Sequence, residues 1–178
     1  MDILVHICCG PCGVAFMDGI LKEDFQPTML WHNPNIHPFT EYKKRRGAAM
    51  DFAAIKQLPV EADEFYGLRD FVTNVAEDFD KRCAYCYRTR LEFTAKYAAE
   101  NGFAAFSTTL LASPYQNFEA ICQFGQKMAA AYGCKFVIRD FRGGFRAAMD
   151  EARKMGLYMQ KYCGCVFSEE KGRGKHRV

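Results

Sequence analysis

Residues 3–12 read ILVHICCGPC, a mostly apolar run that leads directly into three cysteines within five residues. The run ILVHI is short and apolar enough to predict a buried β-strand. Pro11 suits the first turn of an α-helix, where its missing N–H would have no partner anyway. The stretch therefore predicts a strand, a loop and a helix, with Cys8, Cys9 and Cys12 at the carboxyl end of the strand.

The same alternation continues along the chain. We expect extended segments at 27–33, 59–64, 103–110 and 135–141, and helices at 38–58, 68–77, 82–100, 113–133 and 146–155. We expect Ser113 to be the N-cap of helix 113–133. Parallel strands need helical crossovers. We therefore predict one Rossmann-like layered α/β domain at residues 1–168, with a mostly parallel sheet and helices on both faces. A basic C-terminal tail follows at 169–178, and we expect it to be flexible.

Composition narrows the cellular setting and the chemistry. Near its start, the chain of 178 residues carries an acidic residue, Asp2, where a secretory signal carries bases, and no apolar run approaches the length of a membrane span. We expect a cytoplasmic protein with no membrane partner. Nine cysteines are an odd number and would stay reduced in that compartment. Metal binding or redox chemistry is therefore favoured over a disulfide framework.

Two further cysteine pairs stand later in the chain. CAYC supplies Cys83 and Cys86, which share one helix face, and YCGC supplies Cys163 and Cys165 around a flexible glycine. Four such thiolates suit either a [4Fe-4S] cluster or a structural zinc. We expect the remaining two cysteines to serve ordinary core packing, because free cysteine packs as a small hydrophobe; these are Cys122 and Cys134.

The N-terminal cysteines are more than a structural zinc requires. Four ligands saturate such a zinc, whereas Cys8, Cys9 and Cys12 would add three sulfurs at the edge of the sheet where ligands bind. Cys12 also lies in the first turn of a helix, where the dipole favours thiolate. Seven candidate ligands indicate two metal centres, or one centre beside a reactive set of thiols. We expect His6, inside the first strand, to be a buried residue with satisfied hydrogen bonds.

Six motifs in order carry a family resemblance: HICCGPC, EYKKRR, CAYCYRTRL, STTLLASPYQN, DFRGGF and QKYCGCVFS. Together they resemble the cobalamin-independent epoxyqueuosine reductases of the QueH type, over nearly the whole chain. The resemblance implies an enzyme that reduces the epoxide of epoxyqueuosine in tRNA to the cyclopentene of queuosine, with two electrons and two protons and loss of water. The implied partners are that tRNA and an unidentified electron donor.

The resemblance also implies the cofactors, and cobalamin is not among them. A [4Fe-4S] cluster would lie on Cys83, Cys86, Cys163 and Cys165. A second metal ion, implied to be iron, would lie on Cys8, Cys9 and Cys12. Some members carry Asp where this chain has Cys12, so the ligands of the second ion remain open. The pair of centres agrees with the chemistry, since a cluster delivers electrons and a metal ion polarises the epoxide oxygen.

Further residues are predicted to act at the site. We expect Cys8, Cys9, Cys12 and Asp140 to take part in catalysis, with Asp140 as a proton donor or a carboxylate beside the metal. Arginine suits phosphate, and tyrosine stacks on bases. The predicted substrate-binding residues are Tyr42, Arg45, Arg46, Arg88, Thr109, Tyr115 and Arg142. Thr109 and Tyr115 are predicted as hydrogen-bond donors at the carboxyl end of the strand at 103–110, and Arg88 could alternatively supply positive charge beside the cluster.

Two other functions compete with this hypothesis. An iron–sulfur enzyme of tRNA sulfur transfer would need a glycine- and serine-rich pyrophosphate loop after the first strand, and CCGPCG lacks that serine. A non-enzymatic zinc module that binds RNA or protein would hold one zinc and would not need the N-terminal thiols.

Overall fold

The computed structural model describes residues 1–174 and builds them around one five-stranded sheet. Its strands lie in the order β3-β2-β1-β4-β5, and all neighbours are parallel. Their bounds are β1 (Asp2–His6), β2 (Gln26–Trp31), β3 (Val60–Ala62), β4 (Ala105–Thr108) and β5 (Lys135–Phe136). Ile3, Leu4 and Val5 of the central strand β1 are fully buried, as expected for a strand covered on both faces. The predicted α/β fold is confirmed.

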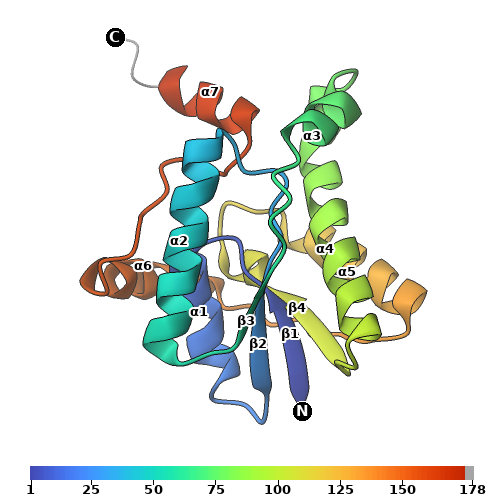
Figure 1. The fold of residues 1–178 in the computed structure, drawn as a ribbon, viewed down its shortest axis with the longest axis vertical. Helices are drawn as coiled ribbons and strands as arrows, with labels where there is room; N and C mark the ends of the chain where they lie inside the picture. Colours follow the sequence, from blue (N-terminus) through green and yellow to red (C-terminus); the bar gives the residue numbers. More distant parts are fainter. Residues whose placement is uncertain (175–178) are drawn as a thin grey trace.

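Helices cover both faces of the sheet (Figure 1). α1 (Gly10–Ile20), α2 (Phe39–Lys56) and α6 (Phe145–Lys154) lie on one side, and α4 (Arg82–Glu100) and α5 (Phe118–Tyr132) on the other. α3 (Leu68–Val75) and α7 (Val166–Gly174) lie beyond the carboxyl ends of the strands. Short 3₁₀ turns are η1 (Phe79–Lys81), η2 (Thr109–Ala112) and η3 (Arg142–Gly144). The predicted tail at 169–178 thus includes residues of α7, and 175–178 lie outside the described residues.

The strand order reverses between β1 and β4. The chain runs outward from β1 to β3, then returns through α4 to place β4 on the other side of β1. His6 and Thr108, the last residues of these two strands, are register partners. The loops that follow them, at 7–9 and 109–117, therefore meet at the point where open α/β sheets bind their ligands.

Two expected elements differ from the structure. α5 begins at Phe118 with Asn117 as N-cap, whose side chain accepts a hydrogen bond from the Ala120 N–H, so Ser113 is not the N-cap. Ser113 ends η2 instead, and its Oγ accepts from the Tyr115 N–H. The strand expected at 135–141 is only Lys135–Phe136, whose two residues are the register partners of Ala105 and Phe106 in β4.

No helix within residues 1–174 combines the length and the apolar character that crossing a membrane would require.

Candidate metal centres and active-site cavity

Cys8, Cys9 and Cys12 form one compact group of thiols. Cys9 is the N-cap of α1, and Cys12 lies in the first turn, so the loop after β1 and the start of the helix turn all three inward. The three sulfur atoms lie within 4.8 Å of one another, and all three residues are buried. The predicted group is thus assembled, and its donors and geometry fit the binding of a metal ion.

The thiols of this group share negative charge unequally. Hydrogen bonds from Cys12 and Cys9 lower the pKa of Cys8 well below its usual value. Burial raises the pKa of Cys9, and the hydrogen bond to Cys8 raises that of Cys12. Thr109 Oγ1 lies 3.5 Å from Cys8 Sγ and accepts a 3.3 Å hydrogen bond from the Cys8 N–H. The arrangement favours one thiolate at Cys8, and metal binding would release the remaining protons.

Cys83, Cys86, Cys163 and Cys165 occupy a second neighbourhood. Cys83 and Cys86 lie at the start of α4, and Cys165 directly precedes α7. Cys86 and Cys165 share an apolar cluster with Phe71 and Val75 of α3. Burial raises the pKa of Cys86 to about 12; the charge of Arg90 opposes this rise, and the charges of the other three cysteines contribute to it. These four thiols are therefore close enough to interact, as the ligands of one cluster must be.

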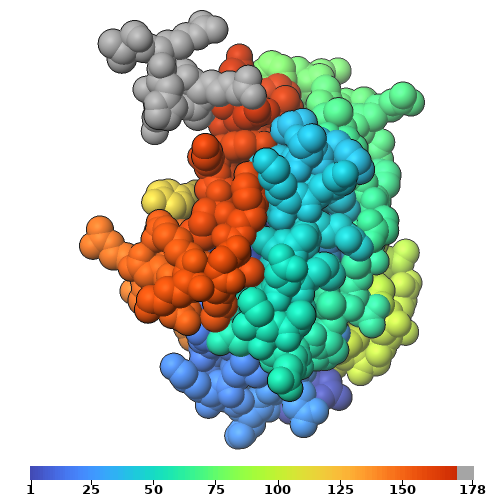
Figure 2. Space-filling model, turned by 60° about the vertical axis from the view of Figure 1, so that its left-hand side comes forward, coloured from blue at the N-terminus to red at the C-terminus, as the bar shows by residue number. Residues whose placement is uncertain are grey.

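The loop carrying Cys163 and Cys165 is held from several sides. Gly164 has a φ of 146°, which side-chain-bearing residues rarely adopt, and its carbonyl accepts a 2.8 Å hydrogen bond from the His37 N–H. The Ser168 hydroxyl donates to the Cys165 carbonyl at 2.7 Å. Gln116 Nε2 donates to Cys163 Sγ at 3.3 Å. The residues after α6 run along α2, as the space-filling view shows (Figure 2).

Arg90 is the functional residue that the sequence analysis missed. It is only 3% exposed, and its Nη2 donates to Cys86 Sγ at 2.7 Å while its Nε donates to the Cys86 carbonyl at 3.1 Å. Burial opposes its charge, but the thiolates of Cys86 and Cys8 raise the pKa of Arg90. Arg88, predicted to bind substrate or alternatively to supply positive charge beside the cluster, is exposed and lies over the Tyr85 ring. Spacing identifies the correct residue, since positions four apart share a helix face.

A cavity of about 530 Å³ connects the two cysteine neighbourhoods. Cys8 and Cys12 contribute from one group and Cys163 from the other, and Arg90 also lines the wall. The remaining lining residues come from the loop before α2, from α2, from the 109–117 loop, and from α6 and the segment after it; they are Ile36, Arg45, Leu110, Ser113, Tyr115, Gln116, Phe145, Met149, Arg153, Met159, Gln160, Lys161 and Tyr162. The cavity is thus large enough for a small organic group and reaches sulfur on both sides.

Comparison with known proteins agrees with this site. The family model described as "Epoxyqueuosine reductase QueH" matches residues 3–171. The chain belongs to this family. The family predicted from the six motifs is confirmed, and with it the prediction of an oxidoreductase.

Two relatives named epoxyqueuosine reductase QueH match along almost their whole length. One from Thermotoga maritima is 37% identical, with 98% of this chain and 93% of the relative covered. One from Dehalococcoides mccartyi is 33% identical, with 97% and 95% covered. The crystal structure of a "predicted subunit of tRNA methyltransferase" from Methanocaldococcus jannaschii has a TM-score of 0.57 at 16% identity, covering 86% of this chain and 74% of that one. This last likeness concerns the fold alone.

Three of the predicted substrate residues lie at the cavity or next to it. Tyr115 lines it with 84% of its surface exposed and contacts Phe145 edge-on at 5.7 Å between ring centroids. Thr109 contacts Cys8, as described above. Arg45 also lines the wall but is buried, and it donates to Glu41, to the Cys163 carbonyl and to the Tyr162 carbonyl. Arg45 therefore holds the cysteine loop rather than presenting its charge to phosphate.

The other four predicted substrate residues, which include the exposed Arg88 described above, are not brought to the cavity. Tyr42 is buried beside Trp31, whose Nε1 donates to its hydroxyl at 3.1 Å, so it is not free to stack on a base. Arg46 is ion-paired with Glu64. Arg142 pairs with Asp140 at 2.6 Å, and these two residues are exposed.

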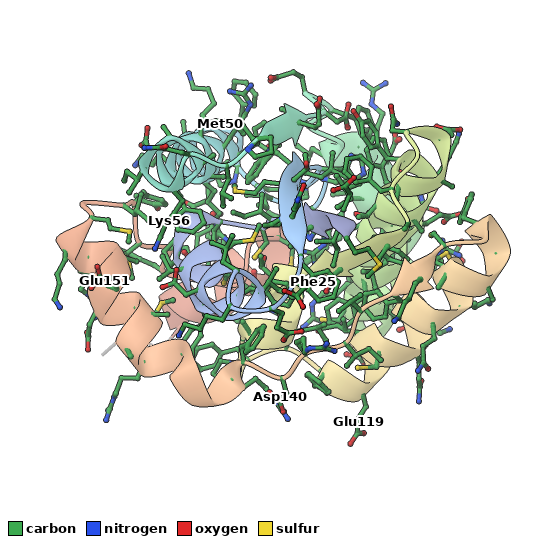
Figure 3. The ribbon with its side chains drawn as sticks, turned by 90° about the horizontal axis from the view of Figure 1, so that it is seen from below. Phe25, Met50, Lys56, Glu119, Asp140 and Glu151 are labelled. Carbon is green, nitrogen blue, oxygen red and sulfur yellow. The ribbon has the colours of Figure 1, made fainter. Side chains whose placement is uncertain are left out.

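Asp140 is placed differently from the catalytic role predicted for it. Figure 3 shows Asp140 at the outer rim, with its side chain directed away from the body of the protein. The Arg142 hydrogen bond lowers the pKa of its carboxyl group, which opposes a role as proton donor. The expected position failed because β5 ends at Phe136, so Asp140 does not follow the end of a strand.

The remaining expectations concern buried residues. Cys122 and Cys134 pack against the main core, as expected. His6 is fully buried and hydrogen-bonded to Thr108 Oγ1 at 2.9 Å and to Asn33 Oδ1 at 3.2 Å, so it is the satisfied core histidine that the sequence indicated.

Proposed function

We propose that this chain reduces the epoxide of epoxyqueuosine in tRNA to the cyclopentene of queuosine, with a [4Fe-4S] cluster and a second metal ion. Cys83, Cys86, Cys163 and Cys165 would hold the cluster. Cys8, Cys9 and Cys12 would hold the second ion, for which we propose iron. The observation that carries the proposal is that a single cavity is lined by cysteines of both groups. Family membership supports this reaction, and we propose that the protein carries it out in the cytoplasm on tRNA.

The donor set fits these two centres. Each thiolate of a four-iron cluster binds a separate iron, so its ligands stand further apart than the ligands of a single ion. Cys8, Cys9 and Cys12 are compact, whereas the other four are spread over the start of α4 and the loop before α7. The buried guanidinium of Arg90 beside Cys86 also suits an anionic group at that place.

When bound, the cluster would deliver single electrons and the second ion would polarise the epoxide oxygen. The chain's own residues would position the substrate. Phe145, Met149 and Leu110 provide apolar wall, so the reacting group is separated from bulk water. Tyr115 is exposed at the cavity and offers a face on which a base can stack. Arg153 and Lys161 line the same cavity and offer positive charge to tRNA phosphates.

The first test is the metal and acid-labile sulfide content of anaerobically purified protein. About five irons and four sulfides per chain are expected for a cluster plus one ion. Cys163→Ser should lose sulfide and visible absorbance. Cys8→Ser should lose about one iron but keep its sulfide and its visible absorbance. Cys134→Ser, on the surface of the core, is the matched control. One zinc and no sulfide in the unmodified protein would refute the proposed cofactors.

The second test follows the reaction itself. Loaded protein, a chemical reductant and tRNA carrying epoxyqueuosine are incubated, and the digested nucleosides are identified by mass spectrometry. We expect conversion to queuosine by the unmodified protein and by Cys134→Ser, and none by Cys8→Ser or Cys163→Ser. Conversion by Cys8→Ser at the unmodified rate would show that the N-terminal thiols do not act in the reaction.

A further inference from the structure

Helix α4 buries a guanidinium that has no carboxylate partner among the described residues. Arg90 is 3% exposed, and its guanidinium donates two hydrogen bonds to Cys86, one to the sulfur and one to the carbonyl. The other buried arginine, Arg45, is paired with Glu41 at 2.7 Å. A charge taken out of water without a counter-charge is strongly destabilising. The anion that balances Arg90 must therefore come from the sulfur sites around it.

The position of Arg90 places it between both groups of thiols. Its guanidinium contacts Cys86 of the second group, and it lines the cavity together with Cys8, Cys12 and Cys163. The hydrogen bonds from Nε and Nη2 to one residue fix the guanidinium plane. Lysine cannot make this pair of directed bonds, because its charge is a single point on a flexible stem.

We propose that Arg90 is a positioning residue that sets the reduction potential of the cluster through its N–H···S hydrogen bond to Cys86. This inference rests on the proposed function, since it needs a cluster on Cys86. Reduction adds negative charge to a cluster, and a nearby positive charge with a directed hydrogen bond stabilises the reduced form more than the oxidised form. The potential is therefore more positive with Arg90 than without it.

The positive charge of Arg90 would also act on the substrate. Because Arg90 also lines the cavity, its positive charge would help to stabilise negative charge that develops on the substrate during ring opening. One residue would thus favour electron arrival at the cluster and stabilise the charge that develops on the substrate. The potential is the property that separates this role from a structural one.

The test compares the cluster potential in four proteins by EPR-monitored redox titration of anaerobically purified protein. Arg90→Gln removes the charge, and Arg90→Lys keeps the charge without the directed pair of bonds. Arg88→Gln removes an exposed charge from the same helix and is the matched control for the potential. We expect the unmodified protein and Arg88→Gln to agree, Arg90→Lys to be more negative, and Arg90→Gln to be the most negative.

A second measurement does not depend on the folding of variants. The protein is produced with arginine labelled by ¹⁵N in the guanidinium group, and the reduced cluster is studied by pulsed EPR. Coupling of the cluster spin to ¹⁵N is expected, since Nη2 lies 2.7 Å from Cys86 Sγ. Its absence would overturn the inference even if Arg90→Gln failed to fold.

The outcomes separate the inference from the proposed function. A cluster that is present in the unmodified protein, with an unchanged potential in Arg90→Gln, would overturn the role of Arg90 and leave the reductase intact. An unmodified protein without acid-labile sulfide would overturn the proposed cofactors and the inference with them.

Discussion

Replacing Arg45 by glutamine tests how the fold holds the loop of Cys163 and Cys165. The Arg45 guanidinium is buried and makes three hydrogen bonds, to Glu41 Oε1 at 2.7 Å and to the carbonyls of Cys163 and Tyr162 at 2.8 Å each. Two of these bonds fasten the segment after α6 to α2. Glutamine is too short to reach all three acceptors, so at least two would lose their partner.

The magnitude follows from the burial of the partners. Removing one member of a buried ion pair destabilises a protein by about 3–5 kcal/mol, because the other charge stays buried. Glu41 keeps one hydrogen bond, a 2.6 Å contact from the Tyr158 hydroxyl, which moderates the loss. We therefore expect a decrease of about 3 kcal/mol in the free energy of unfolding. In a domain of this size that corresponds to a fall in Tm of about 6–12 °C.

The assay is urea unfolding of the metal-free, reduced protein, followed by circular dichroism. Arg46→Gln is the matched control, since Arg46 is the next residue on α2 and its ion pair with Glu64 is partly exposed. Exposed pairs contribute at most about 1 kcal/mol, so this control should stay close to the unmodified protein. Equal loss of stability in Arg45→Gln and Arg46→Gln would refute the reasoning.

Three further outcomes follow from the structure. Gly10→Ala should lower the free energy of unfolding by about 1–3 kcal/mol in urea, because its Cβ would lie 2.8 Å from a backbone oxygen of α2. Gly47→Ala meets no atom within 4 Å and should not be destabilised. Burial lowers the pKa of His37 to about 4, so the unfolded chain takes up a proton first as the pH falls. Through His37, stability should then decline by at most about 1.4 kcal/mol per pH unit between pH 6.5 and 4. In pH-dependent melts His37→Gln should lack this share of the slope and keep the share of His6, whose pKa burial lowers to about 3. Gly164→Ala should lower the iron content, whereas Gly102→Ala, also at positive φ but at the far end of α4, should lower only stability.

Local sequence patterns were sufficient for most of the fold. Helix 82–100 was predicted with the bounds that α4 has, because Asn101 and Gly102 give a clear stop signal. The start of α5 could not be predicted in the same way, since Ser113 and Asn117 are both good N-caps. The Tyr87 hydroxyl decides between them by accepting a 3.1 Å hydrogen bond from the Asn117 N–H, and this contact joins segments that are far apart in sequence.

In the candidate site too, local sequence patterns predicted some features, whereas others depend on contacts between distant segments. Cysteine spacing was sufficient to predict both thiol groups, because cysteines a few residues apart in a loop or a helix turn can direct their sulfur atoms to one metal centre. The roles of the arginines were less accessible, since EYKKRR and CYRTR each offer two arginines that look equivalent in composition. Helix periodicity separates them only once a reference residue on the buried face is known.

Each motif contains such a buried reference residue, and in each it separates one inward-facing arginine from one outward-facing arginine. Arg45 lies four residues after buried Glu41 and turns inward to the cysteine loop, whereas its neighbour Arg46 pairs with Glu64 at the surface. Arg90 lies four residues after Cys86 and turns inward, whereas Arg88 is exposed. The inward arginines should therefore affect loop stability and cluster potential with little dependence on salt. The outward arginines, Arg46 and Arg88, remain the candidates for contact with tRNA phosphates. Their replacement should weaken RNA binding, and added salt should weaken binding by the unmodified protein in the same way.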